Sequence, residues 1–332
     1  MSQKDYLVIL GTAIVCLFIG SQFLPEKTAK PPRPEIERPI PPEVELPDKP
    51  SPPILLVPEF VDVPVVSQHI REESLYADIM NRQSSPFTGH SRDTNAHETS
   101  HGIHSDLRNR YSRQLGKKVN GFYVTGGKGV IIEEPGIRLS AVKAYLPQEL
   151  RSYRYNTYIA HQRAWDDVPL YLVDEWVAYV NGASVSVQDV LEGRHDVEWS
   201  DAVSGCLDFS IYCISLAMAV EKGDPGYWES NVQFRRFMDW HLRKAHRIFM
   251  SGRNMEQFKW DKQEKLLASL RNSENGKPMR GFLNRYFGGI WLEDDLQLVP
   301  YLLPRAGNRG SGCIGHNHGI RVNLGDAKSE DE

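Results

Sequence analysis

The chain has 332 residues, of which 40% are hydrophobic and 25% are charged, as in an ordinary globular protein. Its net charge of −4 gives no argument for binding to nucleic acid or to anionic membrane surfaces. We therefore expect no nucleic-acid partner.

An uncharged run from Tyr6 to Leu24, about 19 residues, is long enough to cross a bilayer as one helix. A cleaved signal peptide is the alternative, but no small-x-small cleavage site comes after the run. Residues 1–24 therefore predict an uncleaved transmembrane signal-anchor. The basic residues after the run would place the next domain in the cytoplasm by the positive-inside rule. Short amino-terminal anchors usually export the domain behind them, so we expect a periplasmic or extracellular domain.

Most of the 21 prolines lie between Pro25 and Pro64. Proline removes a backbone donor and fixes φ, so residues 25–64 predict an extended linker that holds a folded domain away from the membrane. The folded domain is expected over residues 65–324. An acidic tail over residues 325–332 comes after it.

The pentapeptide His97-Glu98-Thr99-Ser100-His101 has the pattern H-E-x-x-H. On a helix, positions i and i+4 project from one face, so His97 and His101 can bind the same zinc ion. Glu98 lies on the neighbouring edge, where its carboxylate can take a proton from a metal-bound water. One helical turn thus supplies two ligands and a general base.

The surroundings of this motif predict a helix. Asp93, Thr94 and Asn95 offer N-cap oxygens, and Gly116 is a natural residue for a helix end. A buried stripe at helical spacing is expected on the side that packs against the core. Its residues are Ala96, Ser100, Ile103, Leu107 and Tyr111.

Further elements are predicted downstream. Val119–Thr125 and Gly129–Glu134 flank Gly126-Gly127-Lys128, which indicates a β-hairpin whose edge could bind a peptide as an added strand. A helix is expected from Pro169 to Val180, ended by Asn181-Gly182. The apolar segment from Ala202 to Val220 predicts a buried core helix, with a second membrane span as the alternative. Amphipathic helices are expected over residues 227–250 and 254–273. The fold class is therefore α+β.

A catalytic zinc ion normally has three protein ligands. His104 lies on the same helix as the motif, but a residue at i+7 is about 10 Å along the axis from i. Gly102 comes directly after His101, and no H-x-x-G-x-x-H continuation is present, so a metzincin is disfavoured. A third ligand from another element is therefore favoured.

The HETSH helix, a hairpin and then an acid early on an apolar helix resemble the gluzincin group of zinc metallopeptidases. The resemblance covers about residues 90–182, and its specific parts are HETSH and the placement of Glu175. It implies a zincin-like catalytic domain in which Glu175 is the third zinc ligand. Two features depart from thermolysin-like members: the interval from His101 to Glu175 is longer, and N-E-x-x-S-D is absent. Other candidates for the third ligand are His104, Asp174, Glu134 and His161.

A tyrosine hydroxyl or a protonated histidine commonly stabilises the oxyanion in such enzymes. We take Tyr123, on the hairpin, as the first candidate. The other candidates are Tyr155, Tyr158, Tyr179 and His195. Asp174 is expected to support a ligating histidine. A Gly-rich loop with Cys313, His316 and His318 is interpreted as flexible, with a second metal site or an active-site flap as alternatives.

These patterns together predict a membrane-anchored metallopeptidase with one Zn²⁺ per domain and a peptide or protein substrate. Two alternatives stay open. One is a non-enzymatic anchored module that binds metal or a partner, and the other is a zinc hydrolase of a non-peptide amide such as a cell-wall component.

Overall fold

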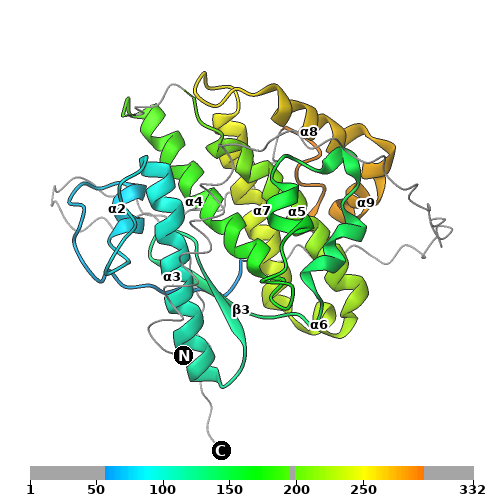
Figure 1. The fold of residues 1–332 in the computed structure, drawn as a ribbon, viewed down its shortest axis with the longest axis horizontal. Helices are drawn as coiled ribbons and strands as arrows, with labels where there is room; N and C mark the ends of the chain where they lie inside the picture. Colours follow the sequence, from blue (N-terminus) through cyan, green and yellow to red (C-terminus); the bar gives the residue numbers. More distant parts are fainter. Residues whose placement is uncertain (1–56, 195–198, 295–332) are drawn as a thin grey trace, which may run out of the picture. The chain divides into compact units, whose positions relative to one another are not determined.

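The computed structural model describes residues 57–194 and 199–294 (Figure 1). The chain divides into two compact units, Met1–Leu298 and Val299–Glu332, and every described residue belongs to the first. The expected anchor over residues 1–24, most of the linker, the acidic tail and the Cys313–His318 loop lie outside the described residues.

Helices make up most of the described residues and accompany a small antiparallel sheet, which confirms the α+β class. The strands are β1 (Val61–Asp62), β2 (Val119–Tyr123) and β3 (Lys128–Glu133). The α-helices are α2 (Leu75–Met80), α3 (Arg92–Leu115), α4 (Tyr171–Leu191), α5 (Ala202–Gly223), α6 (Pro225–Ser230), α7 (Val232–Gly252), α8 (Asp261–Asn272) and α9 (Lys277–Phe287). Short helical turns lie at Leu139–Tyr145, Gln148–Leu150, Asn156–Ala160 and Glu274–Gly276.

The predicted motif helix is α3, the teal helix in Figure 1. It starts slightly earlier than expected, with Ser91 at its N-cap, and it ends at Gly116, whose φ of 64° is the left-handed conformation that glycine tolerates. The predicted stripe faces the core: Ala96, Ser100, Ile103 and Leu107 are buried, and Tyr111 packs against the same cluster.

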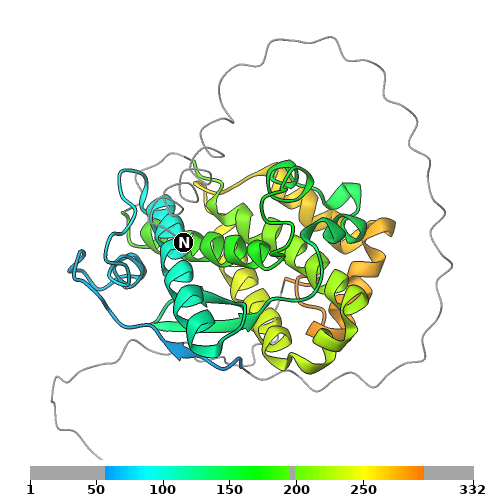
Figure 2. The same ribbon diagram turned by 60° about the horizontal axis from the view of Figure 1, so that its bottom comes forward.

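The predicted hairpin is formed by β2 and β3, which pair antiparallel with Phe122 opposite Val130. Strand β1 adds to the other edge of β3, so the sheet order is β1-β3-β2. Since β1 precedes Val65, chain assigned to the linker takes part in the sheet. Helix α3 lies directly on β2, as Figure 2 shows, because Gly121 leaves room for the helix. A Cβ at Gly121 would be 2.3 Å from Leu107 Cβ.

The end predicted for the next helix at Asn181-Gly182 is wrong. Helix α4 continues through both residues to Leu191. Gly182 serves the contact with α3, since a Cβ there would be 2.8 Å from the Asp93 carbonyl oxygen and 3.4 Å from His97 Cβ. The glycine therefore lets the two helices approach closely, instead of ending one of them.

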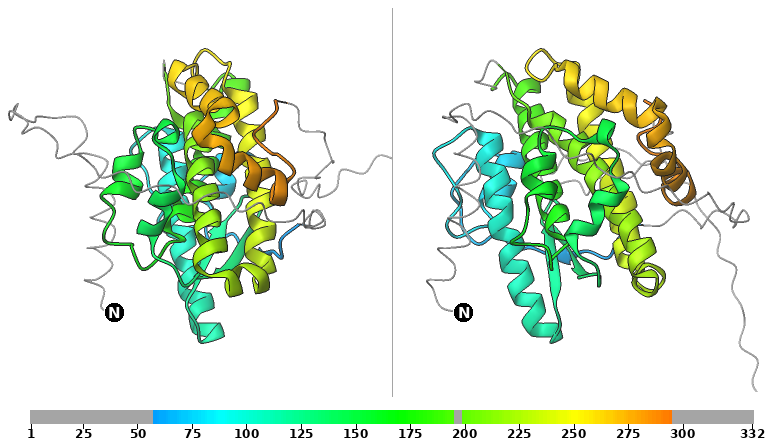
Figure 3. Two further views of the ribbon diagram at one scale, coloured as in Figure 1. Left: turned by 90° about the vertical axis from the view of Figure 1, so that its right-hand side faces the viewer. Right: turned by 45° about the vertical axis from the view of Figure 1, so that its right-hand side comes forward.

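Helix α5 is the only described helix that is long and apolar enough to cross a membrane, and its apolar part, residues 203–220, is buried inside the protein. The prediction of a core helix is confirmed. Helix α4 packs against α3 on one side and α5 on another, and α5 packs in turn against α7 (Figure 3). The helix expected over residues 227–250 is divided into α6 and α7 at Asn231, whose side chain caps α7. Helix α8 begins at Asp261, later than expected, because Trp260 is extended.

Candidate metal centre

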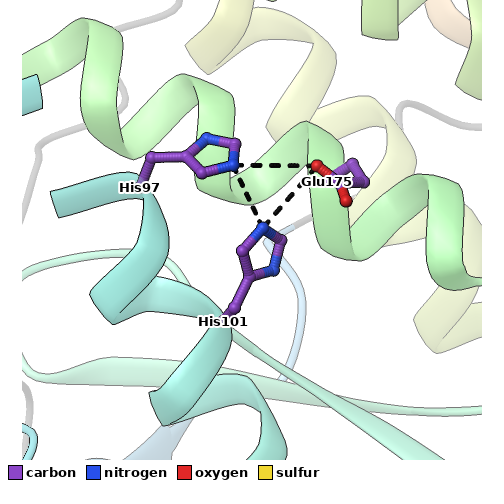
Figure 4. A group of neighbouring side chains, drawn as sticks. All are labelled: His97, His101 and Glu175. Atoms are coloured by element: carbon purple, nitrogen blue, oxygen red, sulfur yellow. Dashed lines mark hydrogen bonds and ion pairs between the residues drawn. The ribbon is translucent and has the colours of Figure 1, made fainter. Parts of the chain in front are cut away.

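His97 and His101 lie one turn apart on α3 and point to the same side of the helix (Figure 4). Their Nε2 atoms are 3.1 Å apart. Two imidazole nitrogens this close cannot both carry a proton without repulsion, so at least one presents a lone pair to the other. Two histidines that bind the same metal ion have this arrangement.

Glu175 comes from the first turns of α4, and its carboxylate points at both histidines (Figure 4). Glu175 Oε2 is 3.7 Å from His97 Nε2 and 3.6 Å from His101 Nε2. This oxygen is buried and has no hydrogen-bond partner among the described residues. Buried carboxylate oxygens are normally paired, so the unpaired Oε2 has the environment of a ligand atom. The three side chains could hold one metal ion.

Asp174, the neighbour of Glu175, binds the opposite side of His101. Its Oδ1 atom accepts a hydrogen bond from His101 Nδ1, and His104 Nδ1 lies 3.1 Å from the same oxygen. With Nδ1 bound to Asp174, the ring of His101 directs Nε2 at His97 and Glu175. His101, His104 and Asp174 form a second group with metal-ligating atoms close together. It shares His101 with the first group but uses the other ring nitrogen.

The titration behaviour of these groups is explained by burial and by their neighbours. Burial, with a smaller contribution from the charge of His101, lowers the pKa of His97 well below its usual value, which keeps the ring neutral as a ligand must be. Burial opposes ionisation of Asp174, but His104 and His101 outweigh it and lower the pKa of this carboxyl. Burial lowers the pKa of His101, but the carboxylates of Glu175 and Asp174 outweigh it and raise the pKa, so a metal ion bound at Nε2 would have to displace the proton that these acids favour there.

Glu98 is the partly buried residue next to His97. Burial raises the pKa of its carboxyl, His101 acts in the opposite direction, and the nearby Glu175 carboxylate raises it further. The structure therefore brings together His97, His101 and Glu175, and Glu98 lies beside His97 on the same helix.

Tyr123 is not part of this group. Its hydroxyl donates to Asp78 Oδ2 over 2.6 Å and accepts from Arg82 Nε over 3.2 Å, and its side chain is fully buried in the cluster under α3. The carbonyl oxygen of Tyr123, the last residue of β2, is also engaged: Asn181 Nδ2 donates to it over 2.8 Å. These contacts give no support to Tyr123 as oxyanion stabiliser, nor to peptide binding along this part of β2.

Other tyrosines do surround the ligand group. The Tyr179 ring packs edge-on against His97 with centroids 4.5 Å apart, and its hydroxyl lies 3.1 Å from that of Tyr158. Burial and the charge of the Glu175 carboxylate raise the pKa of Tyr171. Tyr158 and Tyr179 were among the sequence candidates, whereas Tyr171 was missed. The spacing of Tyr171, Glu175 and Tyr179, four residues apart each time, places all three on one helix face and was the available signal.

Arg154 is a buried residue that no sequence pattern indicated. Its guanidinium donates to Asp208 over 2.6 Å and to Asp201 over 2.8 Å, and it lies 4.9 Å from the centre of the Tyr179 ring. Gly205 gives that ring its space, since a Cβ there would be 2.4 Å from Tyr179 Cδ1. Arg154 and α5 thus fix Tyr179 against His97.

The remaining sequence candidates lie elsewhere. Glu134 accepts hydrogen bonds from Asn120 and from the Leu170 backbone, and burial raises its pKa to about 7. It supports the start of α4. His161 is exposed at the end of a short helical turn, Tyr155 packs under Arg151, and His195 lies outside the described residues.

Comparison of this chain with protein families, with curated proteins and with solved structures finds no significant match.

Proposed function

We propose that the chain is a zinc-dependent hydrolase with a gluzincin-like catalytic domain, in which His97, His101 and Glu175 bind one Zn²⁺ and Glu98 is the general base. Peptide bonds are the proposed substrate. The observation that carries the proposal is the triangle formed by His97 Nε2, His101 Nε2 and Glu175 Oε2.

The size of this triangle suits zinc. Tetrahedral ligands at zinc bond lengths of 2.0–2.1 Å lie about 3.3 Å from one another. The separations here are 3.1, 3.6 and 3.7 Å. A point about 2.0 Å from all three atoms exists, which equals a zinc–nitrogen bond length. Two neutral imidazoles and one carboxylate are also a donor set that catalytic zinc sites use.

A zinc ion bound here would polarise a scissile carbonyl and promote ionisation of water. Glu98 would take the proton of the attacking water and return it to the leaving amine. The carboxylate of Asp174 would hold His101 through Nδ1. Tyr158 and Tyr179, beside His97 and Glu175, are the hydroxyl donors best placed to stabilise an oxyanion.

The test separates the proposed enzyme from its two alternatives. The purified full-length chain is incubated with zinc and a mixed peptide library, and new termini are identified by mass spectrometry. Peptide cleavage that requires zinc and is lost in Glu98→Gln supports the proposal. Zinc binding without any hydrolysis would indicate a non-enzymatic module. Hydrolysis of cell-wall amides with no peptide cleavage would indicate the non-peptide hydrolase.

The membrane anchor over residues 1–24 and the export of the domain remain proposals from the sequence alone. Membrane fractionation with amino-terminal sequencing tests them: an intact amino terminus in the membrane fraction is expected, and a soluble form starting near residue 25 would contradict it.

A further inference from the structure

His104 is the third histidine of α3 and is completely buried, in contrast to His97 and His101. Its ring packs edge-on against Phe122 of β2, with centroids 5.9 Å apart. It stands three residues after His101, so both rings leave the helix on neighbouring faces. The core therefore holds His104 in one place.

One oxygen of Asp174 serves both histidines. Asp174 Oδ1 is bonded to His101 Nδ1, and it is 3.1 Å from His104 Nδ1. An ionised carboxylate only accepts hydrogen bonds, so each ring must carry its proton on Nδ1. The carboxylate oxygen has two lone pairs, which is enough for both donors.

The surroundings of His104 fix the same tautomer. His104 Nε2 is buried and has no hydrogen-bond partner among the described residues. A proton on Nε2 would leave a buried donor unsatisfied and would set the Nδ1 lone pair against the lone pairs of Asp174. With the proton on Nδ1, both costs are avoided. His104 is therefore a fixed donor to Asp174.

We propose that His104 is a positioning residue for the metal centre. It anchors Asp174 Oδ1 to the rigid face of α3, and Asp174 then holds His101 in the tautomer and orientation that direct Nε2 at the ion. This role depends on the zinc site proposed above. It explains why a fully buried histidine lies against Asp174.

A second metal ion held by His101, His104 and Asp174 is the competing use of the same atoms. That ion would need both nitrogens of His101 to bind metal, one on each side. Two ligand atoms of one zinc ion lie about 3.3 Å apart. Asp174 Oδ1 and His101 Nδ1 lie closer together than that, as the two atoms of a hydrogen bond do. The geometry therefore favours the hydrogen-bonded chain.

The test compares His104→Asn, His104→Gln and His104→Leu in the full-length chain. The asparagine amide can place an N–H donor near the position of Nδ1, whereas the glutamine amide reaches towards that of Nε2. Zinc dissociation constants are measured by competition with a chelating dye, and the melting temperature of the zinc-free protein is measured alongside. We expect His104→Leu and His104→Gln to weaken zinc binding about tenfold, since outer-shell partners typically contribute 10–100-fold. His104→Asn should stay near the wild-type value.

A double-mutant cycle shows whether His104 acts through Asp174. Once Asp174→Ala has removed the acceptor, adding His104→Leu should change zinc affinity by less than about twofold. Additive losses would overturn the inference. So would unchanged zinc affinity with only a lower melting temperature, equal effects of asparagine and glutamine, or two zinc ions per wild-type chain. A wild-type chain that binds no zinc would refute the proposed metal centre itself. Failure of the metal centre can therefore be told apart from failure of the role proposed for His104.

Discussion

Two buried polar groups connect α3 with α4, and they differ in how their atoms are paired. In the ligand group, His97, His101 and Glu175 face one another, and Glu175 Oε2 has no hydrogen-bond partner among the described residues. In the second group, here called the Lys244 cluster (Ser100, Asn181 and Lys244), the polar atoms meet partners. Asn181 Nδ2 donates to Ser100 Oγ over 3.1 Å and to the Tyr123 carbonyl over 2.8 Å.

Lys244 completes its cluster from α7. Its Nζ atom donates to the Val124 carbonyl over 2.8 Å, and it lies 3.3 Å from Thr125 Oγ1 and 3.4 Å from Asn181 Oδ1. The three N–H groups of the Lys244 ammonium thus face three acceptor oxygens. These contacts connect the hairpin with α4 and α7. A satisfied buried network stabilises one arrangement of the fold, whereas unpaired atoms that converge on one point are suited to bind something. The comparison predicts opposite consequences of mutation in the two groups.

The largest effect is expected for Glu175→Ala. Loss of a direct ligand should weaken zinc binding by more than about a hundredfold, because outer partners alone contribute 10–100-fold. Glu134→Ala is the control, since Glu134 is a partly buried glutamate that supports the start of α4 and does not face the histidines. Competition with a chelating dye measures both affinities. Equal zinc affinities in the two variants would show that Glu175 is not a ligand.

Glu98→Gln should abolish hydrolysis and leave zinc in place. The amide cannot accept the proton, and loss of a general base costs about 10²-fold or more in rate. Steady-state rates and zinc content are measured on the same preparation. A zinc-free Glu98→Gln protein would show that Glu98 acts as a ligand or as structural support.

Asn181→Ala should act on stability and not on metal. It leaves Lys244 and the Tyr123 carbonyl with one partner fewer in a buried place, so the free energy of unfolding should fall by about 1–3 kcal/mol. Exposed Asn254 provides the control, Asn254→Ala, with little change expected. Denaturant titration of the zinc-free protein measures both. A lower zinc affinity in Asn181→Ala would show that the Lys244 cluster and the ligand group are energetically coupled, which would contradict the comparison.

The last effect is a pH dependence of stability that comes from Lys244. Burial lowers the pKa of its ammonium from 10.5 to about 7 in the folded protein. Above that value the unfolded chain binds more protons at this site than the folded one, so stability rises with pH between about 7 and 10.5, by at most about 1.4 kcal/mol per pH unit. Below pH 7 both states are protonated and the slope disappears. Lys244→Met should remove this rise, which denaturant titrations of the zinc-free protein at pH 7 and pH 9 would detect. An equal rise of the free energy of unfolding in the wild type and in Lys244→Met would contradict the assignment of this pH dependence to Lys244.

The sequence predicted those features whose physical signal is local. Helix α3, its buried stripe and its end at Gly116 could be predicted from helical spacing and capping, and the hairpin from Gly126-Gly127-Lys128. Glu175 could be named only through the resemblance. It is in reach of the histidines because α4 crosses α3 closely.

Other residues have contacts that depend on the tertiary fold. Gly182 has the sequence signature of a helix end, but it serves close packing between helices. Tyr123 was selected for its place on the hairpin, yet its hydroxyl is bound to Asp78 and Arg82. The bond between His104 and Asp174 joins residues 70 apart, so no local pattern could indicate it.

The most direct test of the metal centre is the zinc content of the purified full-length chain, measured by elemental analysis beside the variants His97→Ala and His101→Ala. The convergence of His97, His101 and Glu175 predicts one zinc per wild-type chain and none in either variant. A wild-type chain without zinc under saturating conditions, or a variant that retains a full equivalent, would contradict the proposed site.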